Sequence, residues 1–119
     1  MLPKQTEYKV GMYMRLSRDD ERAGESLSIE NQRTILTRYI EEQGWIVYDE
    51  YIDDGISGTT FEERPSVQRL LEDAQNGRIN LIICKDLSRF GRNYIEVGRY
   101  IDYIFPMYTI RFIALTDNV

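Results

Sequence analysis

Residues 79–84 (Ile-Asn-Leu-Ile-Ile-Cys) restrict the fold more than any other part of the chain. The segment is nearly all apolar and lacks the alternation of polar and apolar residues shown by a strand with one solvent-facing side. Apolar runs of this length are typical of strands buried on both faces of a parallel sheet. Parallel neighbours are joined by crossover connections, which are usually helices. The segment therefore predicts an α/β fold.

Strands and helices are predicted to alternate along the whole chain. Strands are expected where β-branched and aromatic residues cluster, at residues 8–17, 45–52, 79–84 and 110–115. Helices are expected over residues 28–43, with Ser28 as N-cap and Gly44 just beyond the end, from Pro65 to Gly77, and over residues 94–105, ended by Pro106. This order predicts a parallel sheet with helices on both faces and right-handed crossovers.

Two of the predicted helices have an apolar side with helical spacing. In the first helix this side consists of Ile35, Leu36, Tyr39 and Ile40, and in the second it consists of Val67, Leu70, Leu71 and Ala74. Residues 53–63, by contrast, contain two glycines and show no periodicity. They are predicted to form a mobile loop, and such loops often carry function.

Composition excludes several classes of site. A chain of 119 residues suffices for one domain. It contains no histidine and one cysteine, Cys84, so it cannot supply a His-based triad, a histidine metal site, a cysteine cluster or an internal disulfide. No apolar run approaches the ~20 residues of a membrane span and no signal-peptide pattern is present, so a cytoplasmic protein without a membrane partner is expected. The net charge of −5 is unusual for a nucleic-acid-binding domain.

Polar residues gather after the predicted strands. Arg15 and Ser17 are two residues apart at the end of the first strand, so their side chains are expected on one side. A hydroxyl beside a permanent cation suits attack on an anionic group such as a phosphodiester. In open α/β sheets ligands bind at the carboxyl ends of the strands. The other residues expected at this edge are Arg64, Lys85, Asp86, Ser88, Arg89 and Arg92.

Arg89 and Arg92 are three residues apart where a predicted loop, residues 85–93, leads into the third helix. At this spacing both can face one anion near a helix N-terminus. Arginine binds phosphate oxygens bidentately and stays charged at any relevant pH. The alternative is that both arginines form salt bridges with surface carboxylates, and that Arg15 and Ser17 are a surface arginine and a turn serine.

Five segments resemble the catalytic domain of the serine recombinases, the resolvase/invertase family. They are residues 13–17 (Tyr-Met-Arg-Leu-Ser), 26–32 (Ser-Leu-Ser-Ile-Glu-Asn-Gln), 54–58 (Asp-Gly-Ile-Ser-Gly), 64–65 (Arg-Pro) and 85–93 (Lys-Asp-Leu-Ser-Arg-Phe-Gly-Arg-Asn). They occur in the family's order and spacing and span nearly the whole chain. The last two, with the acidic loop, are most similar to large serine recombinases of mobile elements. The resemblance implies a three-layer fold with a mainly parallel sheet flanked by helices.

The resemblance also implies roles for individual residues. Ser17 resembles the nucleophile that attacks a DNA phosphodiester, giving a 5′-phosphoserine and a free 3′-hydroxyl before strand exchange and religation. Gln32 matches a family glutamine near the site. No metal or nucleotide cofactor is implied, because the phosphoserine stores the bond energy for rejoining. The family's arginines around the scissile phosphate correspond to Arg15, Arg64, Arg89 and Arg92.

One position departs from the family pattern. Smaller members often carry aspartate where this chain has Ser88. Asp86, two residues earlier and next to Lys85, is a candidate for the missing carboxylate. Arginine is too basic to act readily as a general base. The group that accepts the proton of Ser17 therefore stays open at this point.

The resemblance further implies parts that 119 residues cannot hold. Family members continue into a long helix for subunit contacts and then into separate DNA-binding domains. Residues 1–119 are accordingly expected to be the catalytic domain of a longer protein. Its expected partners are double-stranded DNA and further copies of itself, as a dimer and then a synaptic tetramer. Because the DNA-binding parts would lie elsewhere, the 119 residues alone are expected to bind DNA poorly.

Two other functions fit the same alternation of strands and helices. A receiver-type phospho-acceptor domain needs clustered carboxylates and a lysine at the strand ends, which Asp19, Asp20, Asp53, Asp54 and Lys85 could imitate. Against it, the first acidic pair follows Arg15 and Ser17, and four arginines would oppose a divalent cation. The other alternative is a catalytically inactive regulatory or assembly module with the recombinase fold.

Overall fold

A four-stranded parallel sheet lies at the centre of the fold. The computed structural model describes residues 7–16, 28–54 and 64–117, and these include a four-stranded sheet in the order β2-β1-β3-β4. Every neighbouring pair is parallel. The predicted parallel α/β fold is confirmed. The strands are β1 (Lys9–Leu16), β2 (Ile46–Asp54), β3 (Leu81–Cys84) and β4 (Arg111–Ala114).

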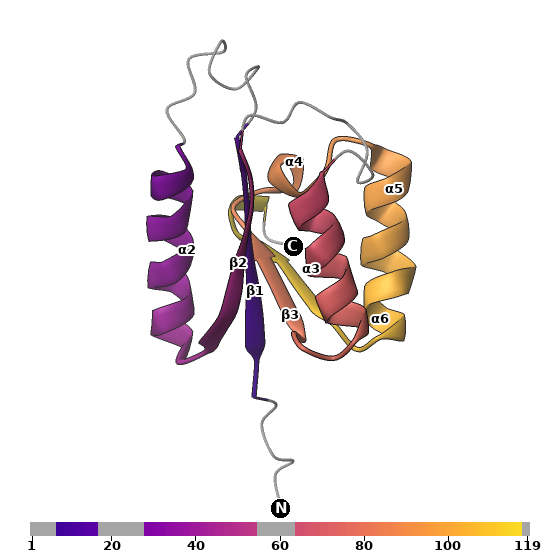
Figure 1. Cartoon of the computed structure of the whole chain (residues 1–119), viewed down its shortest axis with the longest axis horizontal. Helices are drawn as coiled ribbons and strands as arrows, with labels where there is room; N and C mark the ends of the chain where they lie inside the picture. Colours follow the sequence, from indigo (N-terminus) through magenta and orange to yellow (C-terminus); the bar gives the residue numbers. More distant parts are fainter. Residues whose placement is uncertain (1–6, 17–27, 55–63, 118–119) are drawn as a thin grey trace, which may run out of the picture.

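Helices cover both faces of this sheet (Figure 1). Helix α2 (Ile29–Gln43) packs on one face, and α3 (Pro65–Gln75) and α5 (Tyr94–Arg99) lie on the other. Alternate residues of β3 enter the two cores: Leu81 and Ile83 face α2, whereas Ile82 and Cys84 face α3. All four are fully buried. The prediction of a strand buried on both faces is thus confirmed.

Helix α2 begins and ends where the sequence predicts. The hydroxyl of its N-cap, Ser28, accepts a hydrogen bond from the N–H of Asn31 at 3.1 Å, and Gly44 after its last residue has a left-handed φ of 76°. Its buried stripe differs from the prediction, because Ile35 is 36% exposed and Gln32 is buried in its place. The stripe follows i, i+4 spacing from Gln32, which leaves Ile35 at its margin.

Helix α3 buries all four of its predicted apolar residues. Pro65 occupies its first position, where a missing N–H has no intrahelical partner to lose. The helix ends at Gln75, two residues before Gly77, whose φ is 79°.

The third predicted helix does not end at Pro106. Helix α5 continues into a π-helical segment (Tyr100–Ile104) and then into α6 (Phe105–Met107). The N–H of Phe105 donates to the carbonyl of Tyr100, five residues back, and Pro106 lies in the first turn of α6. In a regular helix the proline ring would clash with the carbonyl four residues earlier, and the wider π turn relieves that clash. Within the described part of the chain, no helix combines the length and apolar character needed to cross a bilayer.

The strand order creates a topological switch point. The chain passes from β1 to β2 on one side and returns over β1 to reach β3, so β1 lies between them. The carboxyl ends of β1 and β3 are therefore adjacent, which is where ligands bind in open α/β folds. A short helix, α4 (Leu87–Phe90), follows β3 and lies near the carboxyl ends of β1 and β3 (Figure 1).

Candidate active site

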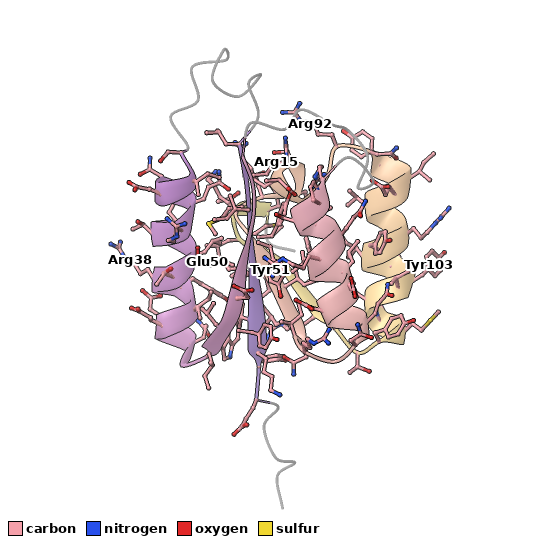
Figure 2. All side chains as sticks on the ribbon, in the orientation of Figure 1. Arg15, Arg38, Glu50, Tyr51, Arg92 and Tyr103 are labelled. Atoms are coloured by element: carbon pink, nitrogen blue, oxygen red, sulfur yellow. The ribbon has the colours of Figure 1, made fainter. Side chains whose placement is uncertain are left out.

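The switch point brings together most of the predicted site residues. Arg15 is the second-to-last residue of β1, Arg64 precedes α3, and Arg89 lies on α4. Figure 2 shows Arg15 and Arg92 at the same end of the molecule, near the carboxyl end of β1. Ser17 and most of the predicted mobile loop, residues 55–63, lie outside the described residues.

The sequence predicts a loop over residues 85–93, but they contain the four-residue helix α4. Asp86 is its N-cap and accepts a hydrogen bond from the N–H of Arg89 at 3.0 Å. Asp is among the strongest N-cap residues. The segment that carries Arg89 lies against the end of β1, where the backbone carbonyls of α4 contact the Arg15 side chain.

Arg15 is 1% exposed and binds the backbone of α4. Its Nη2 donates to the carbonyl of Ser88 at 2.7 Å, and its Nε donates to the carbonyl of Arg89 at 3.2 Å. Gln32 of α2 secures the backbone of Arg15 in turn: its Oε1 accepts from the Arg15 N–H at 3.2 Å and its Nε2 donates to the Arg15 carbonyl at 3.0 Å. Gln32 therefore lies beside the cluster, as the sequence predicts.

Arg64 is also 1% exposed and reaches the same turn from the other side. Its Nη2 donates to the Tyr13 hydroxyl at 2.9 Å, to the carbonyl of Arg89 at 3.3 Å and to the carbonyl of Phe90. Its guanidinium also lies 5.4 Å from the centroid of the Tyr13 ring. The carbonyl end of α4 is thus bound by two guanidinium groups, which suits the negative end of a helix.

Sequence reasoning missed the role of Asp53. The sequence predicts it in the loop, but β2 extends through it, and it is 1% exposed. Its carboxylate accepts hydrogen bonds from the Tyr13 hydroxyl at 2.8 Å and from the N–H groups of Ser66 and Val67 at 3.0 and 3.2 Å. Burial raises the pKa of Tyr13, so the phenol stays protonated and donates to Asp53. No local pattern could reveal this cap, because its N–H donors lie 13 and 14 residues further along the chain.

Asp86 forms a compact polar group with its neighbours. The Ser88 hydroxyl donates to Asp86 Oδ1 at 2.6 Å, Lys85 Nζ lies 3.4 Å from Oδ2, and Arg89 Nε lies 3.9 Å from Oδ1. Partial burial alone would raise the pKa of Asp86. The hydrogen bonds from Ser88 and the Arg89 N–H, with the charges of Arg89 and Lys85, outweigh burial and hold the pKa below its usual range. The carboxylate is therefore ionised at neutral pH.

The two arginines of this segment differ in exposure. Arg89 is 3% exposed, so the alternative of a solvated surface salt bridge does not describe it. Arg92 is exposed and, with Ser88, lines a cavity of about 480 Å³ beside α4. The remaining lining residues are Leu87, Gly91, Tyr94 and Asp117.

The carboxylates required by a receiver-type domain are not assembled in the part of the chain that the structure describes. Asp53 accepts hydrogen bonds from Tyr13 and α3, and Lys85 pairs with Asp86. Within the same residues, no group of three metal-ligating side chains is placed to hold a cation. Asp19 and Asp20 lie outside the described ranges.

The arrangement concentrates permanent positive charge at one edge of the sheet. Arg15, Arg64 and Arg89 interlock through the backbone of α4, so the position of each depends on the others. Preorganised guanidinium groups of this kind stabilise phosphate oxygens, since they need no reorganisation when the anion arrives.

Comparison with known proteins points to one family. The sequence model of the family described as "Resolvase, N terminal domain" matches residues 10–119. Among solved structures, the N-terminal catalytic domain of TP901-1 integrase is 33% identical, with a TM-score of 0.81, and the match covers 93% of this chain and 79% of that one.

Two curated relatives are each 36% identical to this chain. One is a putative DNA recombinase of Bacillus subtilis (strain 168), matched over 87 residues, which make up 73% of this chain and 16% of that protein. The other is the uncharacterized immunity region protein 3 of Bacillus phage phi105, matched over 77 residues, which make up 65% of this chain and 92% of that protein.

Proposed function

Because the chain belongs to the resolvase N-terminal domain family of serine recombinases, we propose that it cleaves and rejoins DNA strands in site-specific recombination. The observation that carries the proposal is the set of buried arginines interlocked around α4 at the switch point of the sheet. These arginines concentrate permanent positive charge at the carboxyl ends of the strands, where ligands bind in open α/β folds, so the edge favours an anionic ligand.

Ser17 is the proposed nucleophile. Its Oγ attacks a DNA phosphorus atom, the bond from phosphorus to Oγ forms, and the bond from phosphorus to O3′ breaks. The Ser17 hydroxyl loses its proton and the leaving O3′ gains one, so the step is balanced without a co-reactant. Attack of the 3′-hydroxyl of an exchanged strand on the phosphoserine reverses the step. The bond energy is conserved, so the proposed chemistry needs no nucleotide.

The charged residues of the site are proposed to stabilise the phosphate. Arg15, Arg64, Arg89 and Arg92 would surround its oxygens, and a single donor aimed at developing charge is typically worth ~3 kcal/mol in the transition state. Asp86 is proposed to replace the carboxylate that smaller family members carry at the position of Ser88. Its hydrogen bonds from the Ser88 hydroxyl and the Arg89 N–H support a role in positioning this segment, whereas its lowered pKa makes it a weak proton acceptor.

The partners follow from the family. We propose that residues 1–119 are the catalytic domain of a protein that binds double-stranded DNA and acts as a dimer and then a synaptic tetramer. The B. subtilis relative, of which the match covers 16%, carries most of its length outside the matched region.

Capture of covalent adducts tests the proposal. The natural protein that contains this chain is produced in cells with DNA from its own element, the cells are lysed in denaturant, and protein-linked DNA is sequenced. The wild type should yield DNA whose 5′ ends resist a 5′-exonuclease and whose 3′ ends terminal transferase can extend. Ser17→Ala should yield none. The matched control is Thr34→Ala, which removes an exposed hydroxyl on α2 and should keep the wild-type yield.

Each failure has a defined meaning. Adducts that persist in Ser17→Ala would refute the assignment of the nucleophile. DNA binding without adducts in any variant would favour the inactive regulatory or assembly module. The phage phi105 relative is a specific reason to keep that second candidate, because the match spans 92% of its length and leaves little room for further domains.

A further inference from the structure

Both ends of α4 are held by hydrogen bonds to side chains. Its carbonyl end accepts hydrogen bonds from Arg15 and Arg64. Its N–H end is bound by Asp86, through the Arg89 N–H, and by Asp117, whose Oδ2 accepts from the Leu87 N–H at 2.7 Å. Asp117 is 30 residues from Leu87 along the chain, so this contact is a tertiary one.

A second contact accompanies that of Asp117. Thr116, in the same short 3-10 turn (Leu115–Asp117), donates its N–H and its hydroxyl to the carbonyl of Lys85 at 2.8 and 3.0 Å. Lys85 and Leu87 flank the N-cap of α4. The segment after β4 therefore secures the start of α4 through three hydrogen bonds.

Asp117 also affects the charge of the site. It lines the same cavity as Ser88 and Arg92. A carboxylate in that cavity opposes the approach of an anion, whereas its hydrogen bond to Leu87 orders the helix that carries Arg89. The two effects act in opposite directions on a reaction with DNA.

We propose that Asp117 is a positioning residue with two separable effects. Its hydrogen bond to the Leu87 N–H sets the position of α4, and its negative charge limits the affinity of the adjacent cavity for phosphate. The first effect stands on the geometry alone, and the consequence for DNA cleavage rests on the proposed function.

Two substitutions separate the effects. Asp117→Asn keeps an oxygen acceptor for the Leu87 N–H and removes the charge, whereas Asp117→Ala removes both. Asp102→Asn, at an exposed position of the π-helical segment, is the matched control for loss of one carboxylate.

The positioning effect is measured by amide hydrogen exchange on the 15N-labelled 119-residue chain. The Leu87 amide should exchange about tenfold faster in Asp117→Ala and within about twofold of wild type in Asp117→Asn, as loss of one hydrogen bond predicts. Equal exchange rates in wild type and Asp117→Ala would overturn the positioning role. This readout does not depend on any activity toward DNA.

The charge effect is measured by titrating the same chain with inorganic phosphate and following the Arg92 side-chain N–H signal. Asp117→Asn should bind phosphate about two- to fivefold more tightly than wild type, in the range expected for one exposed charge pair. Asp102→Asn should bind as wild type does. Unchanged affinity in Asp117→Asn, or an equal gain in Asp102→Asn, would contradict the charge effect.

The consequence for the reaction is a split in kinetic parameters. With the natural protein, Asp117→Ala should slow adduct formation at saturating DNA, and Asp117→Asn should lower the DNA concentration that gives half-maximal rate. If both variants change the rate at saturating DNA and the half-saturating DNA concentration to the same extent, the role of Asp117 is merely structural. If the wild type forms no adduct, the proposed function fails while the amide exchange result still decides the positioning role.

Discussion

At the scale of the residue, the unusual feature is the burial of full charges. Arg64 is 1% exposed, yet it contacts two carbonyl oxygens, the Tyr13 hydroxyl and the face of the Tyr13 ring. Asp53 balances its charge through the same hydroxyl. Buried charges are tolerated only with partners of this kind, and removal of one member leaves the others unsatisfied.

Arg64→Lys should therefore destabilise the fold, although the charge is kept. A lysine ammonium cannot reproduce the planar fork that reaches Tyr13, Arg89 and Phe90 together. We expect a loss of about 2–4 kcal/mol in the free energy of unfolding, measured by urea denaturation with Trp45, the single tryptophan, as the probe. Arg38→Lys, at an exposed position on the outer side of α2 (Figure 2), should change it by less than about 0.5 kcal/mol. An equal loss of stability in Arg64→Lys and Arg38→Lys would show that the guanidinium group of Arg64 does not contribute to stability.

At the scale of the element, β1 packs closely against the side chains of Ile79 and Leu70 at Gly11. The register between β1 and β2 shifts between Val10 and Gly11. A Cβ at Gly11 would lie 2.6 Å from Ile79 Cδ1 and 2.8 Å from Leu70 Cδ1. Helix α3 can pack this tightly on β1 because position 11 has no side chain.

Gly11→Ala and Gly98→Ala should change stability in opposite directions. At position 11 the methyl group forces Ile79 and Leu70 to move, so we expect a loss of about 1–3 kcal/mol. At position 98, on α5, a Cβ meets no atom within 4 Å, and the higher helix propensity of alanine should stabilise the fold by up to about 1 kcal/mol. Thermal unfolding of both variants checks the pair. If Gly11→Ala unfolds at the wild-type temperature, Ile79 and Leu70 can move without loss of stability.

At the scale of the whole molecule, charge is unevenly distributed. The chain has 20 acidic and 15 basic residues, and several of the basic ones gather at the switch-point edge. A protein that neutralises few phosphates gains little from counterion release. An acidic domain with one cationic edge is thus suited to local action on a phosphate rather than to capture of DNA.

The 119-residue chain alone should accordingly bind duplex DNA no more tightly than a dissociation constant of about 10⁻⁵ M at physiological salt, within the range of non-specific binding. Fluorescence anisotropy with a labelled duplex measures this value. Repeating the titration with Arg92→Gln, which removes an exposed cation of this edge, should weaken binding further. Nanomolar affinity of the unmodified chain would contradict the prediction.

Much of the fold could be predicted because it depends on local patterns. Three features were predicted in this way: the apolar run of β3, the cap and terminal glycine of α2, and the apolar stripe of α3. Each is formed by residues that are close together in the sequence. The rule that strand ends form the site then placed Arg15, Arg64 and Arg89 together correctly. The roles of Ser17 and the arginines in catalysis stay predictions.

Other features were decided only by the tertiary structure. The capping of α3 by Asp53 and the hydrogen bond from α4 to Asp117 depend on partners that lie 13 and 30 residues away along the chain. The physical reason is the range of the interactions. Propensity and periodicity act over a few residues, whereas the partner of a buried carboxylate or guanidinium is chosen by packing once distant segments meet. The sequence by itself determined the four strands, the helices α2 and α3 and the edge at which the charges gather, and the tertiary structure decided which polar groups bind one another there.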